Sequence, residues 1–450
     1  MRLTRPFAAV LAAALALGLP ASGRADDLKA GETLDQSTWQ KVGDLLPPEI
    51  LEHYKKGEYQ NPIAEWPADK YNWPPDFKAA SEANEGKFKV GPQGEIQTAE
   101  GGPPPQYILG HPFPRIDAKD PQAGVKIIWN YFYRTYYFGN IFAESQVNLV
   151  APGGLERRLD VAQSYAQYDG VPVEERIPNP ENFLSQALTV VTSPADLNGT
   201  AALSWRYRDP GKRDSSWAYV PALRRVRAVS PANRSDGFLG SDFSSDDGPF
   251  FDGKPEDFEW KVVGEVDQLR IAEGMNLKGK TNIKWLDARE CFNSAGGCSD
   301  TAWPDIPYIG YMDPSWKGVA WAPHGEAVLA KRRFWVVEGI PKDRYYLFGK
   351  LQLYIDQISF QGAWLRKFDW KGELLNVGQV MAWNPLPFTR PDGKVTYVQG
   401  GNSAYQTVES VKLDRATVAG IKSSPNSRFL GRFLYPPDHF STEAMMRAGK

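Results

Sequence analysis

Apolar and polar residues alternate in short runs from about residue 140 onwards. In the stretch TAALSWRYRDPGKRDSSWAYVP, Leu203, Trp205 and Tyr207 alternate with polar residues, and a Pro-Gly turn precedes a second run that holds Trp217. A period of two on both sides of a turn is typical of a β-hairpin. The pattern recurs in KRRFWVVEGI, YYLFGKLQLYI, KVTYVQGG and SFQGAWLRKFDWKGELLNVGQVMAW, where Gly372 can take the positive φ of a tight turn. The chain is therefore predicted to be mainly β (α+β), with a large antiparallel sheet and few helices.

Residues 120–138, DPQAGVKIIWNYFYRTYYF, follow a helical period instead. Asp120 can cap this helix, and Pro121 suits its first turn. The apolar side chains of one face recur at helical spacing: Val125, Ile128, Trp129, Phe132 and Tyr136. A face this aromatic predicts either a core helix or a lid over an apolar cavity. A short helix is also expected near residues 441–448.

Prolines interrupt residues 26–118, as in LLPPEI, YNWPPDF, GGPPPQ and HPFPRID. We expect one short helix in this region, near residues 48–56. The rest is expected to be an extended arm on the surface of the main body, because polyproline-like runs are stiff without internal hydrogen bonds.

The first 25 residues have the layout of a cleaved secretory signal peptide. Arg2 and Arg5 precede an apolar run that ends at Pro20, and small residues follow up to Ala25. The apolar run is too short to span a bilayer comfortably. We expect cleavage near Ala25 and a mature protein in the periplasm.

Two cysteines, Cys291 and Cys298, enclose the short loop CFNSAGGC. In an exported protein such a pair favours a disulfide, worth roughly 2–3 kcal/mol for a loop of this length. A metal site would need two further ligands, and no histidine lies nearby in the sequence.

Charge and motifs argue against several classes of function. The formal net charge of -2 favours neither nucleic acid nor an anionic membrane as a partner of the whole chain. The four histidines are scattered, and the sequence has no zinc-protease, nucleophile-elbow or phosphate-loop motif. We expect no cofactor, no metal and no catalytic residue. An enzyme built around His324, which is close to Glu326, remains an alternative.

The segment SDGFLGSDFSSDDGPF is dense in carboxylates. Its aspartates are Asp236, Asp242, Asp246 and Asp247. The spacing does not match a calcium loop, and an acid/base pair would need a pocket. Residues 206–234 hold eight Lys or Arg against two Asp, and residues 236–259 hold eight Asp or Glu against one Lys. We therefore expect the acidic segment to dock on the basic hairpin through Arg224, Arg225 and Arg227. A metal site, a catalytic pair and a solvated loop remain alternatives.

Three stretches together resemble one bacterial family. They are PFPRIDAKDPQAGVKIIWN, then WAYVPALRRVR followed by FLGSDFSSDD, and then LYIDQISFQGAWLRKFDWKGELL, with an Asp at the end of one strand and a D-x-K-G turn in the next. The chain resembles, over about residues 110–440, an uncharacterised family grouped with outer-membrane lipoprotein-sorting proteins. This resemblance implies a fold like that of LolA and LolB, in which a curved antiparallel sheet forms an open half-barrel plugged by helices. The expected domains are a signal peptide (1–25), the proline-rich arm (26–118) and a half-barrel domain (119–450).

The resemblance also implies a function. Such relatives carry lipid acyl chains through the periplasm, and an RND-type exporter and an outer-membrane β-barrel protein are the implied partners. We expect a carrier of a lipid or other hydrophobic molecule. Its candidate groove residues are Trp205, Tyr207, Trp217, Tyr219, Trp335 and Val337, with Trp129, Phe132 and Tyr136 as a plug. The sequence does not show which face of the sheet is concave, so part of this set is expected to point away from the groove. A ligand-free accessory subunit and a hydrolase of lipid-like substrates are the alternatives.

Overall fold

The protein is mainly β, as the alternating runs predict. The computed structural model describes residues 28–68, 71–73, 75–134, 140–170, 176, 178–273, 276–279, 302–305, 327–382, 386–389, 395–398, 403–421, 429–431, 435–436 and 438–450. Within these residues, 14 strands form one antiparallel sheet, and four segments are α-helical. The predicted fold class, a large antiparallel sheet with few helices, is confirmed.

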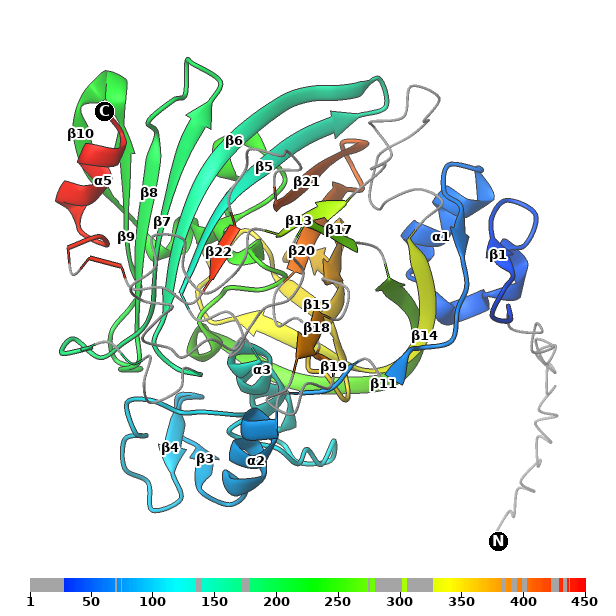
Figure 1. Cartoon of the computed structure of the whole chain (residues 1–450), viewed down its shortest axis with the longest axis horizontal. Coiled ribbons are helices and arrows are strands. Elements are labelled where there is room, and N and C mark those ends of the chain that lie inside the picture. The colour runs from blue at the N-terminus through cyan, green and yellow to red at the C-terminus, as the bar shows by residue number, and fades with distance from the viewer. Residues whose placement is uncertain are drawn as a thin grey trace, which may run out of the picture.

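The large sheet is a series of antiparallel neighbours (Figure 1). Its order is β10-β9-β8-β7-β6-β5-β21-β20-β17-β16-β15-β14-β11, and the short β22 adds to β5. The strands are β5 (Ile141–Ala151), β6 (Gly154–Gln167), β7 (Phe183–Ser193), β8 (Ala201–Tyr207), β9 (Ser215–Val220), β10 (Arg225–Val229), β11 (Phe258–Glu273), β14 (Val328–Pro341), β15 (Lys350–Asp356), β16 (Gly362–Phe368), β17 (Leu374–Ala382), β20 (Ser403–Ser410), β21 (Arg415–Ile421) and β22 (Phe429–Gly431). In the described part of the chain β10 and β11 do not pair with each other, so the sheet is open.

Four pairs of short strands lie outside this sheet. They are β1 (Thr33–Leu34) with β2 (Asn61–Pro62), β3 (Phe88–Val90) with β4 (Ile96–Thr98), β12 (Asn276–Gly279) with β13 (Ala302–Asp305), and β18 (Leu386–Thr389) with β19 (Val395–Val398). The predicted hairpins of the large sheet are confirmed: Leu203 of β8 lies opposite Trp217 of β9, and Gly372 has a φ of 87° in the turn between β16 and β17.

The α-helices are α1 (Pro48–Lys55), α2 (Pro75–Ala83), α3 (Ala123–Tyr133) and α5 (Thr442–Ala448). The sequence predicts α1, α3 and α5. It misses α2, because only Phe77 and Ser81 of that helix are buried and no apolar stripe results. Asp120 does not cap α3 directly; it accepts a hydrogen bond from the backbone N–H of Gln122, just before the helix. No helix in the described part is long and apolar enough to cross a membrane.

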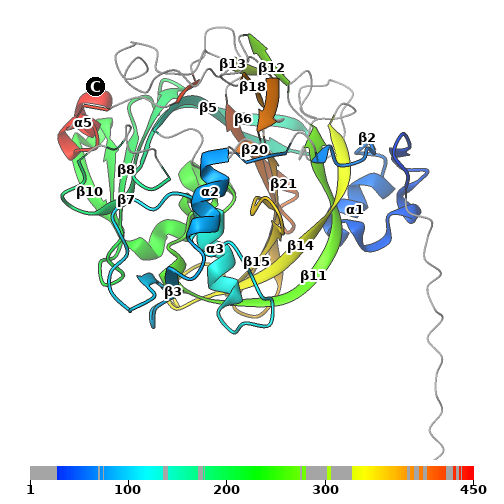
Figure 2. The ribbon, with the colours of Figure 1, turned by 60° about the horizontal axis from the view of Figure 1, so that its bottom comes forward.

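The two faces of the sheet carry separate layers of side chains. Along β14, Trp335 and Val337 pack in the cluster that surrounds α3, whereas Phe334 and Val336 pack in the cluster that contains α1. We call the first the inner face, because the sheet curves around α3 (Figure 2), and the second the outer face.

The N-terminal residues 28–63 are packed firmly on the outer face. Tyr54 of α1 is fully buried. His53 lies between two carboxylates, with Nδ1 2.5 Å from Glu58 and Nε2 2.8 Å from Glu409 of β20. Burial would lower the pKa of His53, but Glu409 and Glu58 outweigh burial and raise that pKa. This ion-paired histidine ties the N-terminal segment to the sheet.

Helix α5 covers another part of the outer face, over β7, β8 and β9. Met445 of α5 is fully buried there. Trp205 of β8 donates a hydrogen bond from Nε1 to the carbonyl oxygen of Phe440 at 2.8 Å. The next residue along β8, Arg206, points to the inner face, where it contacts Asp252.

Candidate functional site

The acidic segment, residues 236–252, is docked on the inner face by buried ion pairs. Arg234 Nε lies 2.6 Å from Oδ1 of Asp246. Lys367 of β16 places its Nζ 2.6 Å from Oδ2 of Asp247. These four side chains are almost completely buried. Buried carboxylates that are each paired with a cation fix the segment in place, so this loop is a structural part of the inner face.

Arg206 connects β8 to the same network. Its guanidinium lies 2.8 Å from Asp214 and 3.0 Å from Asp252. Burial would raise the pKa of Asp214, but Arg206 and Arg234 hold that pKa below its ordinary value. At Asp252 burial outweighs the same two arginines, and the pKa is raised.

Glu256 is a buried carboxyl group close to this network. It is 5% exposed, and among the described residues neither of its side-chain oxygens has a hydrogen-bond partner. Burial raises the pKa of Glu256 to about 7, against the opposing effect of Lys254 and Arg206. The group therefore titrates near neutral pH while it is enclosed by protein.

The docking arginines expected from the sequence lie elsewhere. They are Arg224, Arg225 and Arg227. All three are exposed at the edge strand β10 and its preceding turn, and they form none of the ion pairs found in the described residues. The acidic segment instead crosses the middle of the sheet, where Asp242 pairs with Arg415 of β21 at 2.9 Å. Asp236 is exposed. The expected partners are thus corrected to cations of β8, β16, β21 and Arg234.

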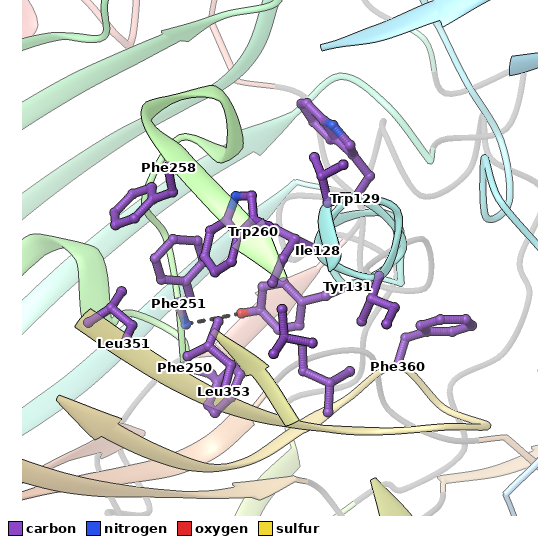
Figure 3. Packing of buried hydrophobic residues seen from close by; sticks show 14 of the residues in the cluster. Ile128, Trp129, Tyr131, Phe250, Phe251, Phe258, Trp260, Leu351, Leu353 and Phe360 are labelled. Carbon is purple, nitrogen blue, oxygen red and sulfur yellow. Dashed lines mark hydrogen bonds between the residues drawn. The ribbon is translucent and has the colours of Figure 1, made fainter. Parts of the chain in front are cut away.

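Aromatic side chains of the docked segment fill the inner face beside α3 (Figure 3). Phe250 and Phe251 are at most 2% exposed. The backbone N–H of Phe251 donates a hydrogen bond to the hydroxyl of Tyr131 in α3 at 3.3 Å. Leu353 of β15 contributes to the same cluster from the sheet. Protein side chains therefore occupy this part of the expected groove.

A cavity of about 400 Å³ lies where α2 and the segment around His111 meet the end of β15. It is lined by Trp73, Lys78, Ser81, Glu82, His111, Pro114, Ile116, Trp335, Gln357, Ile358 and Phe360. We call it the aromatic pocket. The rings of Trp335 and Phe360 stack with centroids 5.4 Å apart, and Trp73 meets His111 edge-on at 5.1 Å. The lining thus combines aromatic and aliphatic side chains with the polar groups of Lys78, Glu82 and Gln357, and concave sites that combine apolar walls with polar groups are typical of small-molecule binding.

One wall of the aromatic pocket is a turn held by Asp356. The carboxylate accepts two hydrogen bonds from Arg332, at 2.7 and 2.9 Å. It also accepts hydrogen bonds from the backbone N–H groups of Ile358 and Ser359, each at 2.9 Å. Burial would raise the pKa of Asp356, but Arg332 above all holds it below its ordinary value. Within this turn Phe360 takes a φ of 52°, a conformation that is unfavourable for a bulky residue.

The lining also contains a buried, neutral histidine, His111, whose ring centroid lies 4.7 Å from that of Phe360. The backbone N–H of His111 donates to Oγ of Ser81 in α2 at 2.9 Å, and Asn84 donates to the His111 carbonyl oxygen at 3.2 Å. Burial, assisted by the nearby charge of Arg134, lowers the pKa of His111 to about 3. The imidazole is therefore uncharged at physiological pH and adds to the apolar character of the aromatic pocket.

The structure separates the ligand-binding residues expected from the sequence. Trp335 lines the aromatic pocket, and Val337, Trp129 and Phe132 lie in the inner-face cluster. The other strand residues point to the outer face beneath α5: Trp205, Tyr207, Trp217 and Tyr219. Trp129 donates a hydrogen bond from Nε1 to the carbonyl oxygen of Gly94, so it serves the packing of α3.

Sequence reasoning missed most of the aromatic pocket. Trp73 and His111 belong to proline-flanked stretches, YNWPPDF and GHPFP, that were expected to be an extended arm. Phe360 follows the strand-terminal Asp of LYIDQISF. That aspartate was the available signal, because a carboxylate at a strand end can hold a turn through backbone N–H groups.

Some expected features lie outside the described residues. They are the signal peptide with Ala25, the disulfide of Cys291 and Cys298, the plug residue Tyr136, and the enzyme alternative at His324 and Glu326. Among the residues that are described, no group of three or more His, Cys, Asp or Glu side chains is placed to hold a metal ion.

Comparison with known proteins gives both a family and similar structures. The family model "Protein of unknown function (DUF1329)" matches residues 33–290, more than half of the chain. An uncharacterized protein of Pseudomonas aeruginosa is 25% identical over 306 residues, which cover 61% of this chain and 54% of that protein. The chain thus spans about half the length of that relative.

The similar solved structures overlap with about seven tenths of the chain. A domain from Vibrio parahaemolyticus, assigned to the outer membrane lipoprotein-sorting proteins, has a TM-score of 0.46 at 16% identity, covering 73% of this chain and 100% of that one. A DUF1329 family protein from Desulfovibrio piger has a TM-score of 0.43 at 14% identity, covering 70% and 94%. A LolA superfamily protein from Nitrosomonas europaea has a TM-score of 0.39 at 11% identity, covering 70% and 97%. The match over residues 33–290 shows that the chain belongs to DUF1329, an uncharacterised family of the kind that its motifs indicated.

Proposed function

We propose that the protein binds a hydrophobic small molecule in the aromatic pocket and carries it through the periplasm. The observation that supports this proposal is the cavity of about 400 Å³ walled by Trp73, Trp335 and Phe360. The mechanism is physical, because transfer of apolar ligand surface from water into such a cavity is favourable by itself.

The size of the cavity limits the ligand. Its volume of about 400 Å³ is at the lower end of the range for drug-sized ligands. One acyl chain or one compact ring system fits this space better than a lipid with several chains. Covering roughly 200 Å² of apolar ligand surface contributes about 5 kcal/mol before the costs of association.

Two parts of the lining of the aromatic pocket are held in place by hydrogen bonds. Asp356 fixes the turn that carries Ile358 and Phe360, and Ser81 of α2 fixes the backbone of His111. A site whose walls are already ordered binds without the entropic cost of ordering them. This supports a binding site over an accidental gap between loops.

The cellular setting is part of the proposal. The secretory layout of residues 1–25 supports export to the periplasm. The resemblance to lipoprotein-sorting proteins supports an RND-type exporter and an outer-membrane β-barrel protein as partners. In this arrangement one partner supplies the ligand, and release occurs to another that offers a better site.

A second candidate is an accessory subunit without a ligand. The observation that favours it is the filling of the inner face by Phe250 and Phe251, which leaves the aromatic pocket as a small remainder of the expected groove. In that case the turn at Ile358, which is 67% exposed, would be a contact surface for the partner.

Native mass spectrometry of protein purified from the periplasm without detergent distinguishes the two candidates. We expect a co-purifying hydrophobic molecule at near one-to-one stoichiometry. The variant Ile116→Trp fills the aromatic pocket and should lose the ligand, whereas Leu155→Trp, at a 40% exposed position on β6, should retain it. A protein that is isolated empty, and that takes up neither fatty acids nor aromatic hydrocarbons, contradicts the carrier and favours the accessory subunit.

A further inference from the structure

The edge of the sheet at β10 carries a concentrated positive charge. Arg224 lies in the turn before β10, and Arg225 and Arg227 lie within it. All three are exposed and take part in none of the ion pairs or side-chain hydrogen bonds found in the described residues. Val226 packs beneath α5 on the outer face, so Arg225 and Arg227 project from the opposite side of the strand.

Nearby acidic side chains are engaged elsewhere. Asp214, Asp246 and Asp252 are held by Arg206 and Arg234, and Asp247 is held by Lys367. These four carboxylates are therefore unavailable to the β10 arginines, whereas Asp236 is exposed and accepts a hydrogen bond from Asn233. The local charge at β10 remains positive although the whole chain has a formal charge of -2.

Apolar side chains are exposed next to these arginines. Val220, the last residue of β9, is 37% exposed, and Leu223, in the turn before β10, is 53% exposed. Charged residues at an edge strand can serve solubility and hinder pairing with another strand. Exposed aliphatic residues beside them serve neither purpose. The combination of exposed aliphatic residues with arginines is instead typical of surfaces that enter the boundary between lipid headgroups and acyl chains.

We propose that the β9–β10 edge, residues 220–227, docks the protein on an anionic membrane surface. The guanidinium groups of Arg224, Arg225 and Arg227 bind lipid phosphates, for which arginine is well suited. Leu223 and Val220 enter the headgroup region. Arginines along an edge strand hinder the addition of a strand from another protein, which favours a lipid surface over a β-strand partner. Docking of this kind would place a carrier at the bilayer where its ligand is taken up or released.

Vesicle co-sedimentation of the purified protein tests the proposal. The probe is vesicles of phosphatidylcholine with and without phosphatidylglycerol, at low and at high salt. A basic residue near an anionic surface changes binding by about fivefold. The triple variant Arg224→Glu, Arg225→Glu, Arg227→Glu should therefore lose at least about tenfold in binding to the anionic vesicles. Leu223→Ser should remove binding that persists at high salt.

A matched variant controls for total charge. Lys56→Glu, Lys87→Glu, Lys119→Glu changes the net charge by the same amount at exposed positions away from β10. It should bind anionic vesicles almost like the wild type. The proposal is overturned if the wild type binds vesicles of pure phosphatidylcholine equally well or binds neither kind. It is also overturned if the β10 variant binds normally, or if the control variant loses as much.

Discussion

Replacement of Asp356 by asparagine tests whether the wall of the aromatic pocket depends on one buried charge. Asp356 is fully buried and accepts two hydrogen bonds from Arg332. A second cation, Arg270, lies 4.0 Å away and is 1% exposed. Two nitrogens of Arg270 have no hydrogen-bond partner among the described residues, so its charge depends on Asp356 for compensation.

The expected loss of stability in the Asp356→Asn variant follows from this geometry. Asparagine keeps the size of Asp356 and one acceptor oxygen, but it leaves the buried Arg270 and the partly buried Arg332 without this counter-charge. Loss of one partner from a buried ion pair costs about 3–5 kcal/mol. We expect the Asp356→Asn variant to lose about that much free energy of unfolding. The turn that carries Ile358 and Phe360 should also loosen, and ligand binding in the aromatic pocket should weaken.

Urea unfolding followed by tryptophan fluorescence measures the loss, with Asp369→Asn as the matched control. Asp369 accepts hydrogen bonds from the backbone N–H groups of Lys371 and Glu373 in an exposed turn, without a buried arginine. This control separates the role of the buried charge from that of a turn-forming aspartate. If Asp356→Asn costs less than about 1 kcal/mol, or no more than Asp369→Asn, the assignment of Asp356 as the counter-charge of both arginines is wrong.

Three further predictions concern buried groups of both faces. The pKa of Glu256 near 7, against an ordinary value of 4.5, corresponds to a penalty of about 3 kcal/mol that is absent below pH 4.5 and complete above pH 7. In urea unfolding, Glu256→Gln should therefore stabilise the protein by up to that amount at pH 8 and hardly at pH 4. The exposed control Glu259→Gln should change the stability equally little at both pH values. An effect of Glu256→Gln that is the same at both pH values would contradict the raised pKa. The raised pKa of His53 means that its ion pairs stabilise the fold fully below pH 6.5 and lose this effect as the pH rises through the raised value. The loss of unfolding free energy caused by His53→Gln should therefore become smaller in alkaline buffer. A loss that is the same at every pH would exclude the charged histidine. Trp217→Ala should lower the unfolding midpoint without changing ligand occupancy, whereas Trp335→Ala should lower occupancy; the reverse pattern in native mass spectrometry would place the ligand beneath α5.

The sequence predicts the hairpins because their signals are local. Alternation of Leu203, Trp205 and Tyr207, followed by Pro-Gly, is sufficient to predict β8 and β9. Gly372 predicts the turn between β16 and β17. Helix α2 lacks such a signal, because Phe77 is its single large buried side chain and its contacts come from distant segments. The packing of the N-terminal residues on the sheet could not be predicted either, because it depends on contacts between residues far apart in the sequence. The ion pair of His53 with Glu409 is an example.

The candidate site was only partly predictable. Periodicity shows which residues of one strand share a face, but not which face of the sheet is covered by α3 and which by α5. Trp335 and Trp217 therefore looked equivalent, although the first lines the aromatic pocket and the second packs on the outer face. Charge complementarity predicted that the acidic segment docks, but not with which cations. Lys367 is 120 residues from Asp247 in the sequence, and topology alone brings them together.

The docked segment also bears on where a ligand would enter under the proposed function. Phe250 and Phe251 are at most 2% exposed, and burial of each contributes about 2–3 kcal/mol. Displacement of the segment would also separate Asp246 from Arg234 and Asp247 from Lys367. Four buried charges would then lose their partners, and each would add a further cost of several kcal/mol. A ligand bound with about 5 kcal/mol of apolar burial cannot provide that much free energy. The segment therefore acts as a permanent filling of the inner face and not as a gate. Under the proposed function, the hydrophobic molecule is therefore expected at the aromatic pocket, whose lining is in place and whose rim reaches solvent at Ile358.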